Sequence, residues 1–416
     1  MNLTKIDGGV TAAAGFEAAG CEAGIKYQGR TDMAMIYCRV PCAAAGTFTS
    51  NVVKAAPVLY DRHIVTDIGK AQAIVINAGI ANACTGRAGY EICEKTAEAA
   101  AAILSEVHAD RAPVSADQVL VCSTGVIGMP IPLDRIVAGT GKLARLTRAD
   151  GGSEAAAAIM TTDTKKKEES FRFVLSDGTE AHIGGMCKGS GMIHPNMCTM
   201  LSFITTDAAI DQSLLQEALR EDIKTTYNRV SVDGDTSTND TCLVLASGLA
   251  GNKTITEKDE DYRLFCEALH AVNEGLARKM AADGEGATML FEAHVIHADT
   301  AAHAGILARS VISSNLTKAA MYGHDANWGR ILCALGYAGV DFDPEKVDLT
   351  LVSAAGTLPI VKDGVAEAYS EEKATLILSE AEVTVICDMK MGDAEGRAWG
   401  CDLTYDYVKI NGDYRS

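Results

Sequence analysis

The segment GGMCKGSGMIHPNMCTM, residues 184–200, constrains the fold more than any other stretch of this chain. Its closely spaced glycines let the backbone approach another backbone or a ligand. It leads directly into CTMLSFITTDAAI, an apolar run with β-branched residues that is typical of a central, buried strand. The segment is not a phosphate-binding loop, because the pattern G-x-x-x-x-G-K-[ST] is absent. The simplest interpretation is a glycine-rich turn that feeds a buried strand.

A second interpretation concerns Thr199, at the start of that strand. A threonine hydroxyl is a poor nucleophile unless a base lies beside it. Cleavage between Cys198 and Thr199 would supply such a base, because the freed α-amino group has an ordinary pKa near 8. The same hydroxyl can attack the preceding carbonyl in the uncut chain, and the small Cys198 side chain favours that attack. The alternative is that Thr199 is an ordinary strand residue.

The remaining pattern alternates short strand-like runs with helical ones, which predicts an α/β fold. Buried strands are expected at 72–83 and 117–128, and helices at 89–109, 133–146, 212–227 and 261–284. From about residue 288 the chain becomes rich in strands. We therefore expect a smaller α+β domain over 288–416 with an antiparallel sheet. The last segment carries apolar residues almost to its end and is expected to be docked.

Composition narrows the function classes. A chain of 416 residues predicts two or three domains, and its net charge of −18 disfavours nucleic acid and anionic membranes as partners. No apolar stretch reaches the roughly 20 residues that span a bilayer. The 13 cysteines and the absence of a secretory signal predict reduced thiols in a cytoplasmic protein. His294 and His297 lie on opposite faces of an expected strand and have no ligand-like neighbours, so we predict no metal site.

Eight motifs, in one order along nearly the whole chain, closely resemble those of the ornithine acetyltransferase family, the bifunctional glutamate N-acetyltransferases of arginine biosynthesis. They are NAGIANACTG (77–86), STGVIG (123–128), AIMTTDT (158–164), KGSGMIHPNMCTM (188–200), VDGDTSTNDT (232–241), ARKMAADGEGAT (277–288), NWGRILCALG (327–336) and WGCDLTYDYVKINGDYRS (399–416). The resemblance implies a layered α/β sandwich, shared with self-cleaving aminopeptidases of the N-terminal-nucleophile type, together with the smaller C-terminal domain.

The resemblance also implies an activity. Self-cleavage would give an alpha chain, 1–198, and a beta chain, 199–416, associated as a heterotetramer with two copies of each. Thr199 would accept acetyl from N-acetylornithine and pass it to glutamate, so no cofactor is needed. Some members of the family also use acetyl-CoA, and no residue of this chain distinguishes the two cases. Cys198 stands where the family usually has alanine.

Site residues carry over motif by motif. Thr124 and Gly125 match the oxyanion-hole pair, although a plain strand-to-helix turn would also account for this glycine. Lys188 matches a substrate-binding lysine, against the alternative of a solvated loop lysine. Thr162 matches a substrate-contacting threonine, with a register uncertain by one residue.

The other substrate contacts lie in the C-terminal half. Glu285 matches the glutamate that binds the substrate amine, although a helix end would also explain its flanking glycines. Asn411 and Ser416 match the last two contacts, and Ser416 stands where threonine is frequent. His194 occupies a position that varies in the family, which favours a residue without a catalytic role over the alternative of a proton shuttle.

Two other functions remain open. A self-processing amidase or aminopeptidase on the same fold would pass the acyl group to water, so free acetate would distinguish it. A non-catalytic binding protein would stay as one intact chain.

Overall fold

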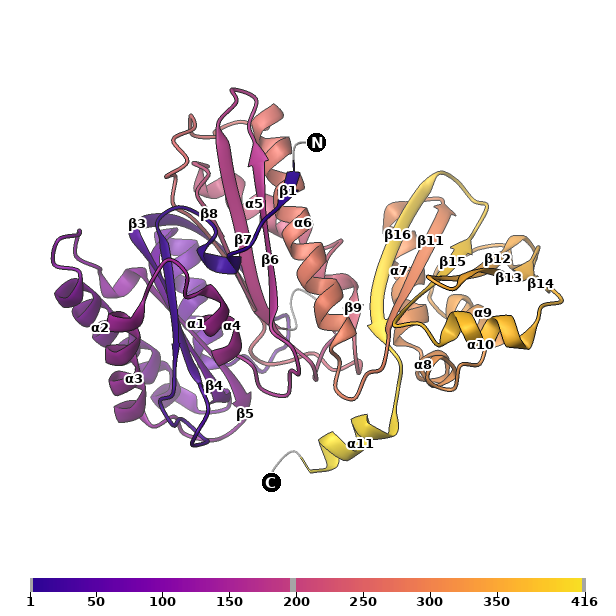
Figure 1. Cartoon of the computed structure of the whole chain (residues 1–416), viewed down its shortest axis with the longest axis horizontal. Helices are drawn as coiled ribbons and strands as arrows, with labels where there is room; N and C mark the ends of the chain where they lie inside the picture. The colour runs from indigo at the N-terminus through magenta and orange to yellow at the C-terminus, as the bar shows by residue number, and fades with distance from the viewer. Residues whose placement is uncertain (1–2, 195–199, 414–416) are drawn as a thin grey trace. The chain divides into compact units, whose positions relative to one another are not determined.

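The structure, a computed structural model, describes residues 3–194 and 200–413. The chain forms two compact units, and each is described by itself. The first comprises residues 1–189, 196–224 and 236–276, and the second comprises residues 190–195, 225–235 and 277–416. Helix α6 (Glu260–Ala282) begins in the first unit and ends in the second. Figure 1 shows the helices and strands in chain order.

The first unit is built on one continuous set of paired strands. Their order is β1-β6-β7-β8-β10-β3-β4-β5, and β2 also pairs with β3. The strands are β1 (Leu3–Lys5), β2 (Phe16–Cys21), β3 (Met33–Phe48), β4 (Lys70–Ile80), β5 (Val119–Val126), β6 (Lys167–Val174), β7 (Glu180–Lys188), β8 (Leu201–Thr206) and β10 (Thr241–Ala246). The helices are α1 (Ala56–His63), α2 (Gly86–Val107), α3 (Leu133–Leu146), α4 (Gly152–Ala158), α5 (Gln212–Asp222) and the first part of α6.

Strand β3 connects two halves of this assembly. Its residues 33–38 pair with β2, whereas its residues 43–48 pair with β10. On its other side it pairs with β4, and the register shifts between Tyr37 and Cys42. An irregularity of this kind bends a strand. One strand therefore serves two groups of neighbours.

Burial explains why these segments take their structures. Strand β4 is buried from Ala71 to Ile80, and its sequence is mostly apolar rather than alternating, with Gln72 and Asn77 as buried polar exceptions. Helix α2 instead buries one stripe, which includes Cys93, Ala97 and Leu104. Helices α2 and α3 lie side by side (Figure 1). The expected strands at 72–83 and 117–128 and the expected helices at 89–109 and 133–146 are confirmed.

The second unit holds a sheet of order β14-β13-β12-β15-β11-β16-β9. Its strands are β9 (Val230–Ser231), β11 (Leu290–Ala298), β12 (Asp348–Ser353), β13 (Gly356–Lys362), β14 (Val365–Ala366), β15 (Glu382–Asp388) and β16 (Ala394–Cys401). Its helices are α7 (Ala301–Ser313), α8 (Asn315–Tyr322), α9 (Trp328–Gly336), α10 (Glu371–Leu378) and α11 (Tyr405–Gly412). The expectation of an antiparallel sheet is wrong in part, because β11 pairs in parallel with β15 and β16 in parallel with β9.

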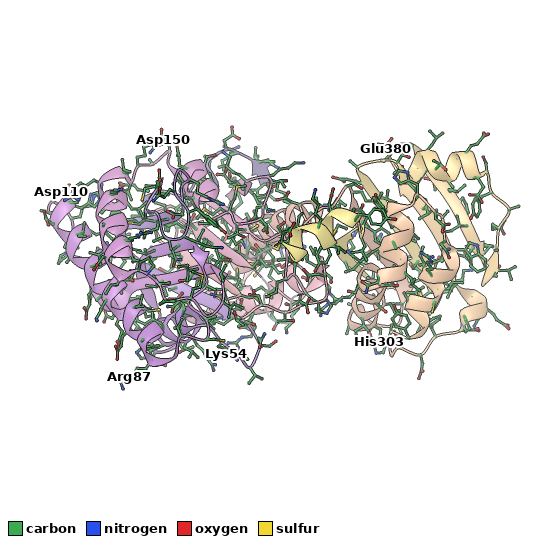
Figure 2. The ribbon with its side chains drawn as sticks, turned by 90° about the horizontal axis from the view of Figure 1, so that it is seen from below. Lys54, Arg87, Asp110, Asp150, His303 and Glu380 are labelled. Atoms are coloured by element: carbon green, nitrogen blue, oxygen red, sulfur yellow. The ribbon has the colours of Figure 1, made fainter. Side chains whose placement is uncertain are left out.

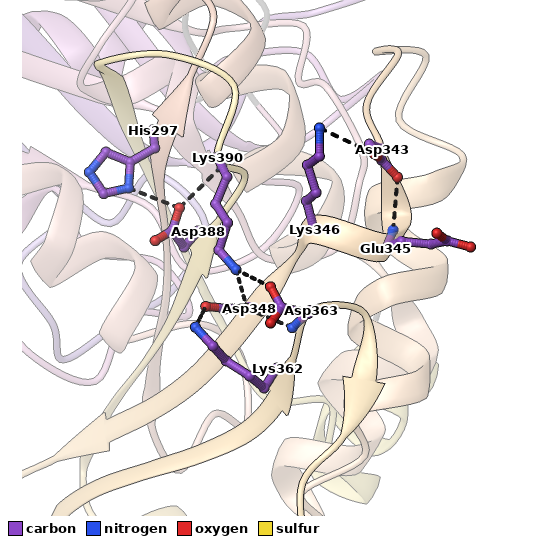
Figure 3. A network of polar contacts seen from close by, with 9 residues as sticks. All are labelled: His297, Asp343, Glu345, Lys346, Asp348, Lys362, Asp363, Asp388 and Lys390. Carbon is purple, nitrogen blue, oxygen red and sulfur yellow. Dashed lines mark hydrogen bonds and ion pairs between the residues drawn. The ribbon is translucent and has the colours of Figure 1, made fainter.

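Charged side chains connect neighbouring strands of this sheet at two places. Between β11 and β16, Glu292 accepts hydrogen bonds from Trp399 Nε1 at 2.9 Å and from Arg397 at 2.6 Å. At the start of β12, Asp348 pairs with Lys362 on β13 and, at 2.7 Å, with Lys390 (Figure 3). Lys390 thereby fastens the end of β15 to the β12–β13 hairpin.

The C-terminal segment, which was expected to be docked, forms helix α11. Thr404 caps it, because its side chain accepts a hydrogen bond from Tyr407 N–H. No residue of this helix is buried, and Tyr405 is 81% exposed. The helix contacts its own unit through the hydrogen bond from Asn411 to Glu285 and through the ring of Tyr405, whose centroid lies 5.7 Å from that of Tyr322 on α8.

The acidic charge of the chain is carried mostly on its surface. Figure 2 shows Asp110 and Asp150 pointing outward from the first unit, and Glu380 from the second. No helix within the described residues is long and apolar enough to cross a membrane.

Candidate active site

The predicted cleavage point, Cys198 and Thr199, lies outside the described residues. The chain that follows it is well defined, because Leu201 opens β8 between Lys188 on β7 and Thr241 on β10. Thr241 N–H donates a hydrogen bond of 2.8 Å to the Met200 carbonyl. The expectation that this segment forms a central buried strand is confirmed, since all of β8 is buried.

The predicted oxyanion residues lie at the end of β5, where the backbone has little freedom. Gly125 has φ = +130°, a conformation that side chains other than glycine's rarely allow. A Cβ atom on Gly125 would also lie 2.6 Å from Ile80 N and would overlap the Gly79 carbonyl. Both constraints require glycine here.

Lys188, the last residue of β7, points toward this turn. It is buried, and its Nζ donates a hydrogen bond of 3.4 Å to Thr124 Oγ1. The interpretation of Lys188 as a solvated loop lysine is therefore wrong. The long distance marks a weak bond that leaves the ammonium able to bind another acceptor.

A buried carboxylate supports the same strand end. Asp163 Oδ1 accepts hydrogen bonds from Gly189 N–H at 2.8 Å and from Lys167 Nζ at 2.7 Å. Burial alone would raise the pKa of Asp163, but the Lys188 and Lys167 charges lower it below its usual range. Thr162 is half-buried and directly precedes Asp163. The segment with Thr162 is thus fastened beside the Lys188–Gly189 end of β7.

Asp240, which directly precedes β10, was not predicted as a site residue. It is 2% exposed, and its Oδ2 has no hydrogen-bond partner within residues 3–194 and 200–413. Burial raises the pKa of this carboxyl well above its usual range, against the opposing effects of Ser237 and Lys188. Asp240 belongs to the motif VDGDTSTNDT, to which the sequence analysis assigned no role.

In the second unit, two predicted substrate contacts meet. Glu285 is buried, and its Oε2 accepts a hydrogen bond of 2.7 Å from Asn411 Nδ2 on α11. Its backbone N–H bonds to the Ser190 carbonyl at 2.9 Å. Gly191 leaves room for the carboxylate, because a Cβ there would lie 2.5 Å from Glu285 Oε1. Ser416, the third predicted contact of this half, lies outside the described residues.

The histidines contact individual partners. His294 pairs with Glu395 at 2.8 Å, and His297 pairs with Asp388 at 2.8 Å. Within the described part of the chain, no group of three or more potential ligands could hold a metal ion. His194 Nδ1 bonds to Ser231 Oγ at 2.9 Å, and burial together with the Arg309 charge lowers its pKa to about 4. His194 is therefore neutral at neutral pH.

Comparison with known proteins identifies the family. The sequence pattern of the ArgJ family matches residues 17–416. A protein of Symbiobacterium thermophilum described as arginine biosynthesis bifunctional protein ArgJ is 51% identical over 411 residues, covering 98% of this chain and 99% of its own. The protein of the same description from Caldanaerobacter subterraneus is 47% identical, with 99% of each chain covered.

A crystal structure of the Bacillus halodurans protein of that description has 47% sequence identity and a TM-score of 0.49, covering 51% of this chain and 99% of that one. The match of the family over almost the full length, together with relatives near 50% identity, confirms the resemblance drawn from the eight motifs. The chain belongs to the ArgJ family.

Proposed function

We propose that this enzyme transfers acetyl from N-acetyl-L-ornithine to L-glutamate through an acetyl ester on Thr199. The proposal is supported by membership of a family whose members are described as bifunctional proteins of arginine biosynthesis. The observation that carries it is the end of β5, where Gly125 is obligatory and Lys188 hydrogen-bonds to Thr124. That arrangement offers fixed donors to a developing oxyanion.

The first step is self-cleavage. Thr199 Oγ attacks the Cys198 carbonyl carbon, the peptide C–N bond breaks, and the hydroxyl proton passes to the departing nitrogen. Water then hydrolyses the resulting ester, which leaves Cys198 with a carboxylate and Thr199 with a free amino group. That amine becomes the base for the hydroxyl on the same residue.

Acetyl transfer repeats this chemistry with a substrate amide. Thr199 Oγ attacks the acetyl carbon of N-acetylornithine, its proton moves through the α-amino group to the leaving nitrogen, and ornithine departs. The amine of glutamate then attacks the ester and restores the hydroxyl. Thr124 and Gly125 would stabilise the oxyanion in both halves, an effect worth about 10²–10³ in rate per donor.

The other groups bind the amino-acid part of the substrates. Glu285 supplies a carboxylate for a substrate ammonium group, and its bond from Asn411 fixes the orientation of that carboxylate. Lys188, Thr162 and Ser416 supply donors suited to a substrate carboxylate. The acetyl group is conserved through the cycle, so the reaction needs no cofactor. The cleaved chains would remain together, two of each.

Intact mass spectrometry tests the mechanism. The wild type should give fragments 1–198 and 199–416, and the second fragment should gain one acetyl group from N-acetylornithine alone. Thr199→Ala should stay whole and inactive, whereas Thr256→Ala, at an exposed threonine, should behave as wild type. An intact wild-type chain with full transferase activity would contradict the mechanism.

Two additions to the assay separate the alternatives. Release of free acetate in preference to acetylglutamate would favour the amidase. Incubation with acetyl-CoA in place of N-acetylornithine shows whether that donor also acetylates Thr199.

A further inference from the structure

Asn239 is a buried asparagine whose side chain is fully occupied. Its Nδ2 donates to two carbonyls, that of Ala81 at 2.6 Å and that of Ser123 at 2.7 Å. Its Oδ1 accepts a hydrogen bond of 2.7 Å from Thr238 Oγ1. A buried amide with both donors and its acceptor satisfied is held rigidly, and it holds its partners in turn.

The two acceptors lie on neighbouring strand ends: Ser123 directly precedes the proposed oxyanion donors in β5, and Ala81 directly follows β4. The Ser123 carbonyl shares a peptide plane with Thr124 N–H, so the bond from Asn239 fixes the plane directly before Thr124. Ala81 follows the β4 irregularity at Gly79 and Ile80, against which Gly125 packs. One side chain therefore holds the ends of β4 and β5 in place.

The same short segment also holds the strand that follows the proposed nucleophile. Two residues after Asn239, Thr241 donates its N–H to the Met200 carbonyl and pairs with Leu201. Thr241 Oγ1 bonds back to the Asn239 carbonyl at 2.9 Å, which makes residues 239–241 a compact unit. This segment thus links the start of β8 to the end of β5 through two short hydrogen-bonded steps.

We propose that Asn239 is a positioning residue that sets the distance between the nucleophile strand and the oxyanion turn. This rests on the proposed function, because it gives Asn239 a role only if Thr124 and Gly125 stabilise an oxyanion. Asn239 itself touches neither the substrate nor the reacting atoms. Its effect should appear in the rate of acyl transfer and be absent from the binding of ornithine.

The variant Asn239→Asp keeps the size of the side chain, removes both donors and sets a carboxylate against two carbonyl oxygens. Asn252→Asp is the matched control. Asn252 is also buried in the first unit, and its Nδ2 donates to the carbonyls of Ala209 at 3.1 Å and Lys253 at 2.8 Å. Both variants should lose stability, but only one of the two asparagines lies at the turn. Should Asn239→Asp fail to fold, Asn239→Ala removes the donors without adding a charge.

The measurements are the single-turnover rate of Thr199 acetylation by saturating N-acetylornithine, the rate of self-cleavage, the dissociation constant of L-ornithine and the melting temperature. We expect the Asn239 variant to lose about 100-fold in acetylation or cleavage rate, the scale of one oxyanion donor. Its ornithine affinity should change less than about threefold, because an oxyanion donor acts on the transition state and not on the bound ground state. Asn252→Asp should keep both rates within about threefold at a similar loss of melting temperature.

Equal rates in the Asn239 and Asn252 variants would overturn the role of Asn239, as would a loss of ornithine affinity that accounts for the whole effect. A wild-type enzyme that carries no acetyl on Thr199 would instead overturn the proposed function. The two failures are therefore distinguishable.

Discussion

The buried pair of Asp163 and Lys167 gives the sharpest stability prediction. The two side chains are 0% and 1% exposed, and their charged atoms are 2.7 Å apart. In Asp163→Asn, the amide keeps an acceptor for Gly189 N–H but removes the negative charge that lies 2.7 Å from Lys167 Nζ. Removing one partner of such a pair costs about 3–5 kcal/mol, a large share of the roughly 5–15 kcal/mol that stabilises a typical domain.

Urea unfolding followed by far-UV circular dichroism at pH 7 measures the loss. Glu180→Gln is the control, because it breaks the exposed Arg172–Glu180 pair between β6 and β7 and should cost at most about 1 kcal/mol. The double variant Asp163→Asn/Lys167→Met removes both charges and should recover much of the stability. The reasoning would be refuted if Asp163→Asn and Glu180→Gln lost the same free energy of unfolding, or if the double variant were no more stable than Asp163→Asn.

The pH dependence of the same pair has a definite sign. The pKa of Asp163 is lowered in the folded protein, whereas in the unfolded chain it is about 3.9. Its contribution is therefore complete above that value and declines as the pH falls below it. The stability gap between wild type and Asp163→Asn should narrow only below about pH 4.

Two further changes probe the strands under the oxyanion turn. Asp61 is fully buried and accepts a hydrogen bond of 2.7 Å from Val121 N–H. Burial raises the pKa of Asp61 to about 8. The folded protein therefore holds a proton that the unfolded chain releases near pH 4. The free energy of unfolding of the wild type should therefore fall as the pH rises from about 4 to about 8. In Asp61→Asn this fall should be smaller, as measured by urea unfolding at several pH values. The same pH dependence of unfolding free energy in both proteins would contradict the prediction. Gly125→Ala should cost about 2–4 kcal/mol through strain and overlap with Gly79, and about 100-fold in acetylation rate. Gly128→Ala, at φ = +80° with open space around it, should show strain alone, and equal effects of the two alanines would count against the required glycine.

Local patterns predicted those elements whose burial is continuous or strictly periodic. The strand at 72–83 and the helix at 89–109 are examples, because the strand is almost wholly buried and the helix buries one stripe of its surface. Strand partners are a different matter. The parallel pairing of β11 with β15 spans more than eighty residues of intervening chain, and no local feature of either strand records it. The terminal segment was expected only to be docked, and its helix α11, capped by Thr404, was not predicted.

The site residues divide in the same way. Thr124, Gly125, Lys188, Glu285 and Asn411 were predicted from motifs, and the structure brings them together within each unit. Asn239 and Asp163 were missed although both lie inside quoted motifs. Asn239 matters because it binds backbone carbonyls, and Asp163 because it pairs with the buried Lys167. Residue type alone predicts neither contact. A polar residue among buried neighbours was the available signal.

The strand order has a consequence for how the chain is made and how it holds together. β8 and β10, which follow the proposed cut, lie between β7 and β3, which precede it. The pairing of β3 with β10 requires residues 241–246, so the first unit can close only after more than half of the chain has been synthesised. In the closed sheet of a cut chain, strands of the second piece would lie between strands of the first. Separating the two pieces would require breaking two ladders of backbone hydrogen bonds, β7 with β8 and β10 with β3, so a cut at the proposed position would leave both pieces in one sheet.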